Sequence, residues 1–309
     1  MDTIFANMLP VFAAGCGGWI LARRMPIDLR SLGCCVIYFI APIVNFDAVM
    51  KAPATAAMVV LPLAAFIIGG ANSILTYAWT RRALPASEAC LTASSASSAN
   101  TLYYGLGLAV ALLPPPMLAA YLLAAIGLSV SESLFGFFFL ARTGFSWQQA
   151  LRRVARLPVL YAVALGVVCR LVALENPAFL APLAAYSRGA LILVGSLILG
   201  VALGQERLQR LPLSLIGAIV ASRHLTFAAL AGLLLWLDSL TGQLIAPRYH
   251  PLFLLFALMP IANNTLTFAA TLELPTGRIG SAIILSNLLA FAAVCALFLA
   301  VPAGRIFEL

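Results

Sequence analysis

Apolar segments long enough to cross a bilayer follow one another along nearly the whole chain. Of the 309 residues, 63% are hydrophobic and only 9% are charged. A soluble domain averages about 25% charged residues, which keep its surface in water. In a bilayer the outer surface must also be apolar, and helices satisfy their own backbone polar groups there. The composition therefore predicts an all-α polytopic membrane protein with a single membrane domain over residues 1–309.

Clusters of proline and charge divide the chain into ten predicted transmembrane helices, because both residue types end apolar helices. Each span needs roughly 20 apolar residues, so ten spans leave only short loops. The first apolar stretch lacks preceding basic residues and a cleavage site, so we expect a span there and no signal peptide. The spans are placed at residues 4–22, 31–50, 54–79, 88–112, 116–140, 157–174, 183–204, 212–237, 251–271 and 279–303.

Basic residues are distributed unevenly between the two sides of this predicted bundle. The loops after odd-numbered spans contain Arg23, Arg24, Arg30, Arg81, Arg82, Arg142, Arg152, Arg153, Arg156, Arg207, Arg210 and Arg278. The other side carries Lys51, Arg170, Arg248 and Arg305. Cytoplasmic loops hold the excess of Lys and Arg, so both termini are expected on the non-cytoplasmic side of a bacterial-type inner membrane. This topology accounts for the net charge of +8 without a nucleic-acid partner.

Two short motifs recur at equivalent places in the two halves of the chain. The Leu-Pro-Val of residues 9–11 returns at residues 157–159, where the first and sixth spans begin. The Asn-Thr-Leu of residues 100–102 returns at residues 264–266, in the fourth and ninth spans. Because each half would hold an odd number of spans, the second half must enter the membrane from the opposite side. The pattern predicts two inverted five-helix repeats, an architecture typical of secondary transporters.

The fourth and ninth spans contain residues that interrupt membrane helices. A run of small polar residues at 92–101 precedes Gly105 and Gly107, and Pro260 precedes the Asn-Asn-Thr of residues 263–265. Broken helices that cross would direct positive half-helix N-termini at one place, which favours an anion. Close helix packing is the alternative reading. Packing accounts for the serines but not for asparagines at midplane depth.

The fourth span resembles the auxin efflux carrier family, which includes bacterial permeases for malate- and malonate-like acids and the plant auxin exporters. Residues 99–107 look like the family's Asn-Thr-x-x-x-Gly-x-Pro crossover motif, with Gly107 where proline is usual. Looser matches lie at residues 21–24, 41–42, 157–162 and 193–195. The resemblance covers nearly the whole chain and implies ten helices in two inverted halves.

The same resemblance implies two functional parts. A scaffold, often dimeric in the family, would comprise residues 4–50 and 157–204, which leaves a homodimer through these helices open. A moving transport domain would comprise residues 54–140 and 212–303, with the broken helices crossing at its centre. Amide NH2 groups there would donate hydrogen bonds to a carboxylate. The expected substrate-binding residues are Asn100, Thr101, Asn263, Asn264, Thr265 and Arg188. The expected helix-breaking residues are Pro42, Gly105, Gly107 and Pro260.

Charged and titratable side chains inside the predicted spans need a reason, because a midplane charge costs roughly 3 kcal/mol or more. Five of them are candidates for a functional role. Arg188 either snorkels to the interface or binds substrate, in which case it would favour a dicarboxylate. Glu132 would carry a proton, bind a cation or pair with Arg188 or Arg223. His224 titrates near neutral pH and could shuttle protons, beside Arg223. Asp47 is either solvated at the interface or lines the outer vestibule.

These features favour a secondary carrier, a permease for a small mono- or dicarboxylate that works by alternating access with an elevator-like motion. The alternative is a sodium-coupled symporter similar to the bile acid:sodium symporters, so coupling to H+ or Na+ stays open. We expect no enzyme activity, no cofactor and no metal site. Paired membrane acids are missing from the sequence, and His224 and His250 lack metal-site spacing. A channel or receptor without coupled transport is a further alternative.

Overall fold

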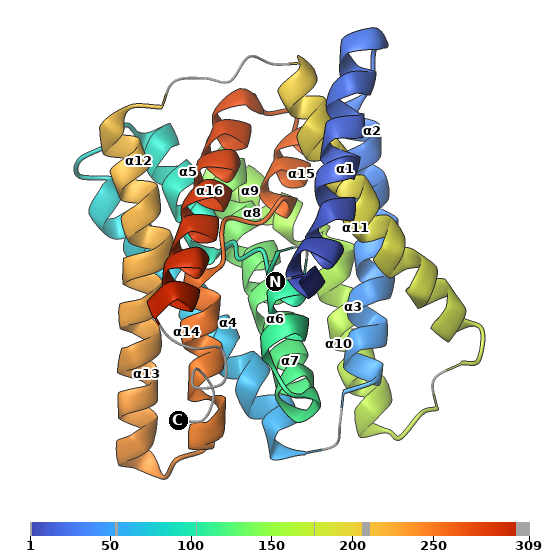
Figure 1. The fold of residues 1–309 in the computed structure, drawn as a ribbon, viewed down its shortest axis with the longest axis vertical. Coiled ribbons are helices and arrows are strands. Elements are labelled where there is room, and N and C mark those ends of the chain that lie inside the picture. The colour runs from blue at the N-terminus through green and yellow to red at the C-terminus, as the bar shows by residue number, and fades with distance from the viewer. Residues whose placement is uncertain (1, 53–54, 103, 176, 206–210, 301–309) are drawn as a thin grey trace.

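The computed structural model describes residues 2–52, 55–102, 104–175, 177–205 and 211–300, and the regular structure within these ranges is all helical (Figure 1). Six described helices are long and apolar enough to cross a membrane, and a seventh joins them if one bent pair counts as a span. These are Leu29–Met50, Val59–Thr80, Pro115–Ala141, Leu180–Gln205, Leu213–Thr241 and Gly277–Val294, with the pair Trp147–Val154 and Pro158–Leu171 bent by 44°. The prediction of an all-α membrane protein is confirmed at this level.

The helices are α1 (Asp2–Arg24), α2 (Leu29–Cys35), α3 (Ala41–Met50), α4 (Ala56–Thr80), α5 (Ala86–Ser97), α6 (Gly105–Leu112), α7 (Pro115–Ser131), α8 (Phe137–Ala141), α9 (Trp147–Val154), α10 (Pro158–Leu171), α11 (Leu180–Gln205), α12 (Leu213–Val220), α13 (Phe227–Thr241), α14 (His250–Leu258), α15 (Asn264–Thr271) and α16 (Gly277–Ala300). Three π-helical segments lie inside longer helices, η1 (Val36–Ile40), η2 (Glu132–Gly136) and η3 (Ala221–Thr226), and η4 (Pro247–Tyr249) is a 3-10 turn. Such π segments accommodate an extra residue and are frequent at functional sites.

Pro42 does not break its helix, so this prediction is wrong. The chain is helical from Leu29 to Met50, through α2, η1 and α3. Pro42 lies in the first turn of α3, directly after the π-helical turn. Proline removes one backbone donor and crowds the carbonyl four residues earlier. The wider π-helical turn before Pro42 provides a local adjustment of the kind that lets membrane helices tolerate proline.

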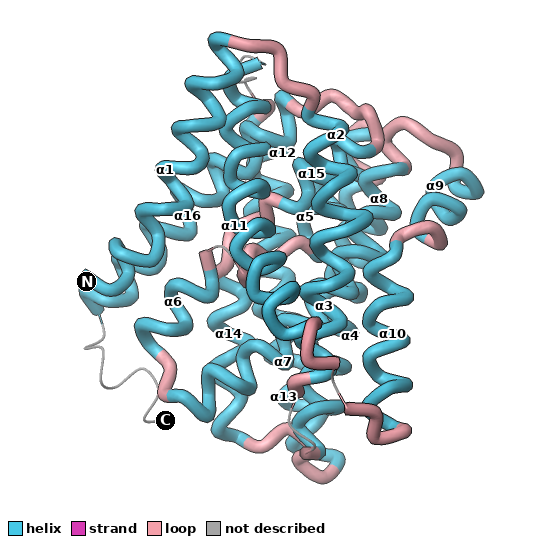
Figure 2. The backbone as a smooth tube through the Cα atoms, turned by 90° about the vertical axis from the view of Figure 1, so that its right-hand side faces the viewer, coloured by secondary structure: helices cyan, strands magenta, loops and turns pink. Residues whose placement is uncertain are grey.

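Both interruptions predicted in the fourth and ninth spans are present. In the first, α5 ends at Ser97 and α6 begins at Gly105. In the second, α14 ends at Leu258 and α15 begins at Asn264. Figure 2 shows loop segments at mid-height of the bundle as well as at its two ends. Pro260 lies within the second interruption, whereas Gly107 lies inside α6 and does not break it. Helix α6 begins at Gly105, whose backbone N–H donates to the carbonyl oxygen of Asn100 at 2.8 Å.

Glycines let certain helix pairs approach closely. A Cβ atom on Gly127 of α7 would collide with the backbone of Pro62 in α4. A Cβ atom on Gly200 of α11 would collide with the backbone of Gly15 in α1. Such contacts are typical of membrane helices, where small residues allow backbones to pack directly. Figure 1 shows α1, α2, α3, α10 and α11 on one side, and α12 and α13 on the opposite side.

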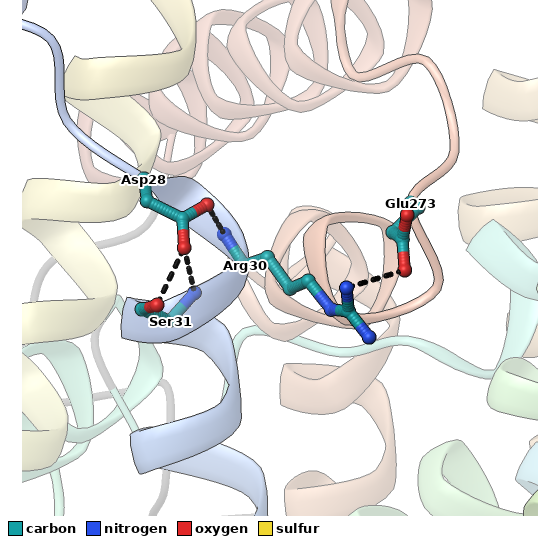
Figure 3. A network of polar contacts seen from close by, with 4 residues as sticks. All are labelled: Asp28, Arg30, Ser31 and Glu273. Carbon is teal, nitrogen blue, oxygen red and sulfur yellow. Dashed lines mark hydrogen bonds and ion pairs between the residues drawn. The ribbon is translucent and has the colours of Figure 1, made fainter.

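A polar network fixes the start of α2 (Figure 3). The side chain of Asp28 caps the helix by accepting from the backbone N–H groups of Arg30 at 3.1 Å and Ser31 at 3.2 Å. The Ser31 hydroxyl also donates to Asp28 and, as the largest cause, holds the pKa of this carboxyl below its usual value. Arg30 in turn pairs with Glu273 at 2.8 Å, which ties α2 to the turn after α15.

Candidate functional site

The two interrupted helices contact each other through their non-helical segments. The backbone N–H of Asn100 donates to the carbonyl oxygen of Pro260 at 2.9 Å. The backbone N–H of Ala262 donates to Oγ of Ser98 at 3.2 Å. Oγ of Ser98 also lies 2.7 Å from Oγ1 of Thr265. Backbone groups freed from one broken helix are therefore satisfied by the other, as the membrane interior requires.

Glu132 places a carboxyl group beside this contact. Its side chain is almost fully buried, with the residue 4% exposed. Ser98 donates to Oε1 at 2.6 Å, and Nδ2 of Asn264 donates to Oε2 at 3.4 Å. Glu132 is the first residue of the π-helical segment η2, within the span Pro115–Ala141. A buried acid that joins both interrupted helices is a candidate for ion or proton coupling.

Asn100 organises the first interruption. Its side-chain Oδ1 accepts from the backbone N–H of Tyr104 at 3.1 Å, just before α6 begins. The carbonyl oxygen of the neighbouring Thr101 accepts from the Tyr121 hydroxyl at 2.7 Å. A Cβ atom on Gly105 would meet that hydroxyl, so the close approach of Tyr121 requires glycine there. Asn100 and Thr101 are both buried.

Asn263 lies at the start of α15, where it is buried. Its backbone carbonyl accepts from the N–H groups of Leu266 at 3.0 Å and Thr267 at 3.2 Å, which forms the first turn of the helix. The first turn of α15 therefore fixes the position of the two asparagines at the end of the second interruption. Asn264, the first residue of that helix, extends its amide to Glu132.

Arg223 and His224 lie together in the π-helical segment η3 and contact the end of α14. Arg223 has no exposed surface and donates from Nε to the carbonyl oxygen of Met259 at 3.0 Å. Nδ1 of His224 lies 2.8 Å from the carbonyl oxygen of Ala257. Both side chains therefore bind backbone oxygens at the second interruption.

A cavity of about 460 Å³ lies between α3, α6, α7 and α11. Most of its lining is apolar, including Leu102 and Leu106 from the first interrupted helix. The polar residues in the lining are Asn45, Asp47, Lys51, Ser129 and Arg188. The cavity thus brings elements of the predicted scaffold and of the predicted transport domain to one space.

The charges of this cavity are grouped around Asp47. Its side chain is 1% exposed and pairs with Nη1 of Arg188 at 2.5 Å and with Nζ of Lys51 at 2.9 Å. The side chains of Arg188 and Lys51 are 45% and 49% exposed. Two cations therefore face one buried carboxylate, which leaves one formal positive charge in the lining. Because both cations are half exposed, a bound anion has access to them.

The predicted site residues fall into three groups. One group gathers at the contact between the interrupted helices and comprises Asn100, Thr101, Asn263, Asn264, Thr265 and Glu132. Arg223 and His224 bind carbonyl oxygens at the end of α14. Asp47 and Arg188 lie in the cavity, whose lining does not include the asparagines of the first group among the residues described. Leu102 and Leu106 connect the first group to the cavity, because they lie within two turns of chain after Asn100 and line the cavity.

Sequence reasoning missed three residues in or beside the crossing region, the place where the segments 98–104 and 259–263 of the two interrupted helices contact each other. The Ser98 hydroxyl contacts both Glu132 and Thr265, and the Tyr121 hydroxyl donates to the carbonyl oxygen of Thr101. Asn72 of α4 donates to the carbonyl oxygens of Ala96 and Ser222, both at 2.9 Å. The cost of a lone amide at membrane depth would have identified Asn72. Ser98 lies in a serine-rich run in which no pattern distinguishes it.

Comparisons with known proteins add no assignment to this geometry. Neither the protein-family models nor the curated proteins searched include a match to this chain. The resemblance to the auxin efflux carriers therefore remains a prediction from the residues of the fourth span.

Proposed function

We propose that this chain is a secondary transporter that moves a small organic anion across a membrane by alternating access. The observation that carries the proposal is the contact between two interrupted helices inside an apolar helical protein, made by Asn100 and Pro260. Irregular backbone at membrane depth is tolerated where it lies within protein or lines a cavity. In secondary transporters, discontinuous helices of this kind form the substrate and ion sites.

Ten crossings in two inverted halves fit this proposal. Each interrupted pair, α5 with α6 and α14 with α15, then counts as one crossing, and α1 is the first of the ten. The interrupted pairs become the fourth helix of each half. On this scheme both termini lie on the non-cytoplasmic side of a bacterial-type inner membrane, and scaffold helices are available for a homodimer.

The cavity supports an anion as substrate. One net positive charge remains around Asp47, and Arg188 and Lys51 keep N–H groups that Asp47 does not use. Arginine and lysine donate strong charge-assisted hydrogen bonds to carboxylates. The apolar remainder of the lining suits the carbon skeleton of a small organic acid. We therefore propose a carboxylate, with Asn100 and Asn264 as its contacts when the transport domain moves.

Glu132 is the proposed coupling group. It lies at the contact of both interrupted helices and is bound by Ser98 and Asn264. Its carboxyl group would bind a proton, or a sodium ion in the alternative of a symporter similar to the bile acid:sodium symporters. Replacing sodium by choline in an uptake assay separates the two, because only the symporter loses accumulation.

The purified chain in proteoliposomes tests the proposal. Labelled mono- and dicarboxylates should enter with saturable kinetics, and internal unlabelled acid should accelerate uptake by counterflow, which a channel does not show. Asn100→Ala and Asn264→Ala should each lower the rate about tenfold or more, since each removes an amide donor to a charged ligand. Asn287→Ala is the matched control, because its amide donates to Ile283 of its own helix α16. Saturable uptake that both crossing variants retain in full would refute the assigned site.

A further inference from the structure

The C-terminal ends of α5 and α14 meet at one buried guanidinium group. Arg223 donates from Nη1 to the carbonyl oxygen of Ala96, in the last turn of α5, at 3.4 Å. It donates from Nε to Met259 at 3.0 Å and from Nη2 to Phe256, at the end of α14. The last carbonyl groups of a helix lack partners within that helix. One side chain from a third span therefore serves both interrupted helices.

The positive charge of Arg223 is opposite in sign to the partial charges at the two helix ends. A helix C-terminus carries roughly half a negative charge, so two such ends present about one negative charge together. Arg223 supplies one positive charge and is completely buried. Its guanidinium also lies over the ring of Phe227, 4.6 Å from the centroid, which is a favourable cation–π contact. Among the described residues Arg223 forms no direct ion pair, so the carbonyl oxygens and the ring are its direct contacts. The buried carboxyl group of Glu132 lies near enough to attract it electrostatically as well.

We infer that Arg223 is a resident cation in a site built from backbone carbonyl groups. In secondary transporters, half-helix C-termini and unwound carbonyl groups bind sodium ions. Here the guanidinium occupies the equivalent kind of oxygen cluster, so the chain neutralises its own helix ends without a bound ion. Removal of the side chain opens a site for a small monovalent cation, with guanidinium as the best-fitting occupant. In this role Arg223 stabilises the contact between the interrupted helices, whether or not the protein transports an anion.

Thermal unfolding of the purified full-length chain in detergent tests this inference. Arg223→Ala should lower Tm, and guanidinium chloride at about 10 mM should restore about half or more of the loss by binding the native state. Sodium chloride should restore less and choline chloride nothing, at equal ionic strength. Arg153→Ala is the matched control, because Arg153 also stacks on a ring, that of Phe145, but is exposed and outside the crossing. If guanidinium raises Tm equally in both variants, the carbonyl site is refuted.

A second pair of variants keeps the test decisive if Arg223→Ala does not fold. Arg223→Lys retains the positive charge, whereas Arg223→Met retains similar length without charge. The resident-cation role requires a higher Tm and a higher folded yield for the lysine variant. Equal Tm and yield for lysine and methionine would show that packing, not charge, is the contribution of Arg223.

Discussion

Substitution of Arg188 by methionine tests the role of the cavity between α3 and α11. Arg188→Met keeps most of the side-chain volume and removes one of the two cations that face Asp47. Asp47 retains Lys51 at 2.9 Å, so the buried carboxylate is not left alone and the protein should fold. The formal charge of the lining falls from one positive charge to zero. The variant therefore removes the electrostatic attraction for an anion while the cavity remains.

The size of the effect follows from the exposure of Arg188. A hydrogen bond to a charged group contributes about 1.5–3 kcal/mol when it is well shielded. Arg188 is 45% exposed and already spends one N–H group on Asp47. The lower end of that range is therefore appropriate, and about 1.4 kcal/mol corresponds to a tenfold change in affinity. We expect KM for a carboxylate to rise about tenfold, with a smaller change in kcat.

Initial uptake rates in proteoliposomes, measured over a range of carboxylate concentrations, give both constants. Arg153→Met serves as the control, since it removes an exposed arginine outside the cavity. A double variant with Asp47→Asn should recover part of the lost affinity, because it returns the lining to one positive charge from Lys51. If Arg188→Met and Arg153→Met give the same KM as the unchanged chain, the cavity is not on the substrate route.

Three further predictions concern other parts of the molecule. Glu132→Gln keeps an oxygen that can accept from Ser98, but the amide cannot carry a proton. Counterflow should therefore persist, whereas accumulation driven by a pH gradient should be lost. Gly127→Ala should lower the free energy of unfolding by about 1–3 kcal/mol through overpacking. Gly217→Ala, inside α12 with nothing within 4 Å of its Cβ position, should instead raise it slightly, by up to about 1 kcal/mol, because alanine favours the helix; thermal unfolding measures both. Removing the exposed Arg30–Glu273 ion pair should lower the free energy of unfolding by about 1 kcal/mol or less, as measured by a double-mutant cycle.

The helical class and the two interruptions were predictable from the sequence because they depend on local chemistry. Long apolar stretches dictate helices in a bilayer. Pro260 and the polar run before Gly105 disfavour a continuous helix in their own neighbourhood. Pro42 shows the limit of such reasoning, since a π-helical turn accommodates it and the helix continues. Whether a proline ends or only distorts a helix depends on the backbone around it, which the residue alone does not specify.

The partners of the polar residues were harder to predict, because they come from distant parts of the chain. Asp47 and Arg188 were each recognised as costly charges, but their ion pair spans 141 positions. Glu132 was considered as a partner for Arg188 or Arg223. In the structure its direct hydrogen bonds come from Ser98 and Asn264, while Arg223 attracts it electrostatically without a direct ion pair. Periodicity and cost arguments identify which polar groups need a partner. The choice among candidates depends on helix packing, which only the folded chain provides.

In the crossing region the buried acid and the buried base each contact a helix end whose dipole has the opposite sign. The carboxyl group of Glu132 accepts from Asn264 at the beginning of α15, where the helix dipole is positive. It also accepts from the hydroxyl of Ser98, the residue that follows α5. The guanidinium of Arg223 binds the ends of α5 and α14, where the dipole is negative. An exchange of the two charges would place each against an end of its own sign, in a medium that does not screen them. Glu132 and Arg223 are therefore complementary to the interruptions themselves, and a carrier that moves this region as one body would keep both charges neutralised along the way.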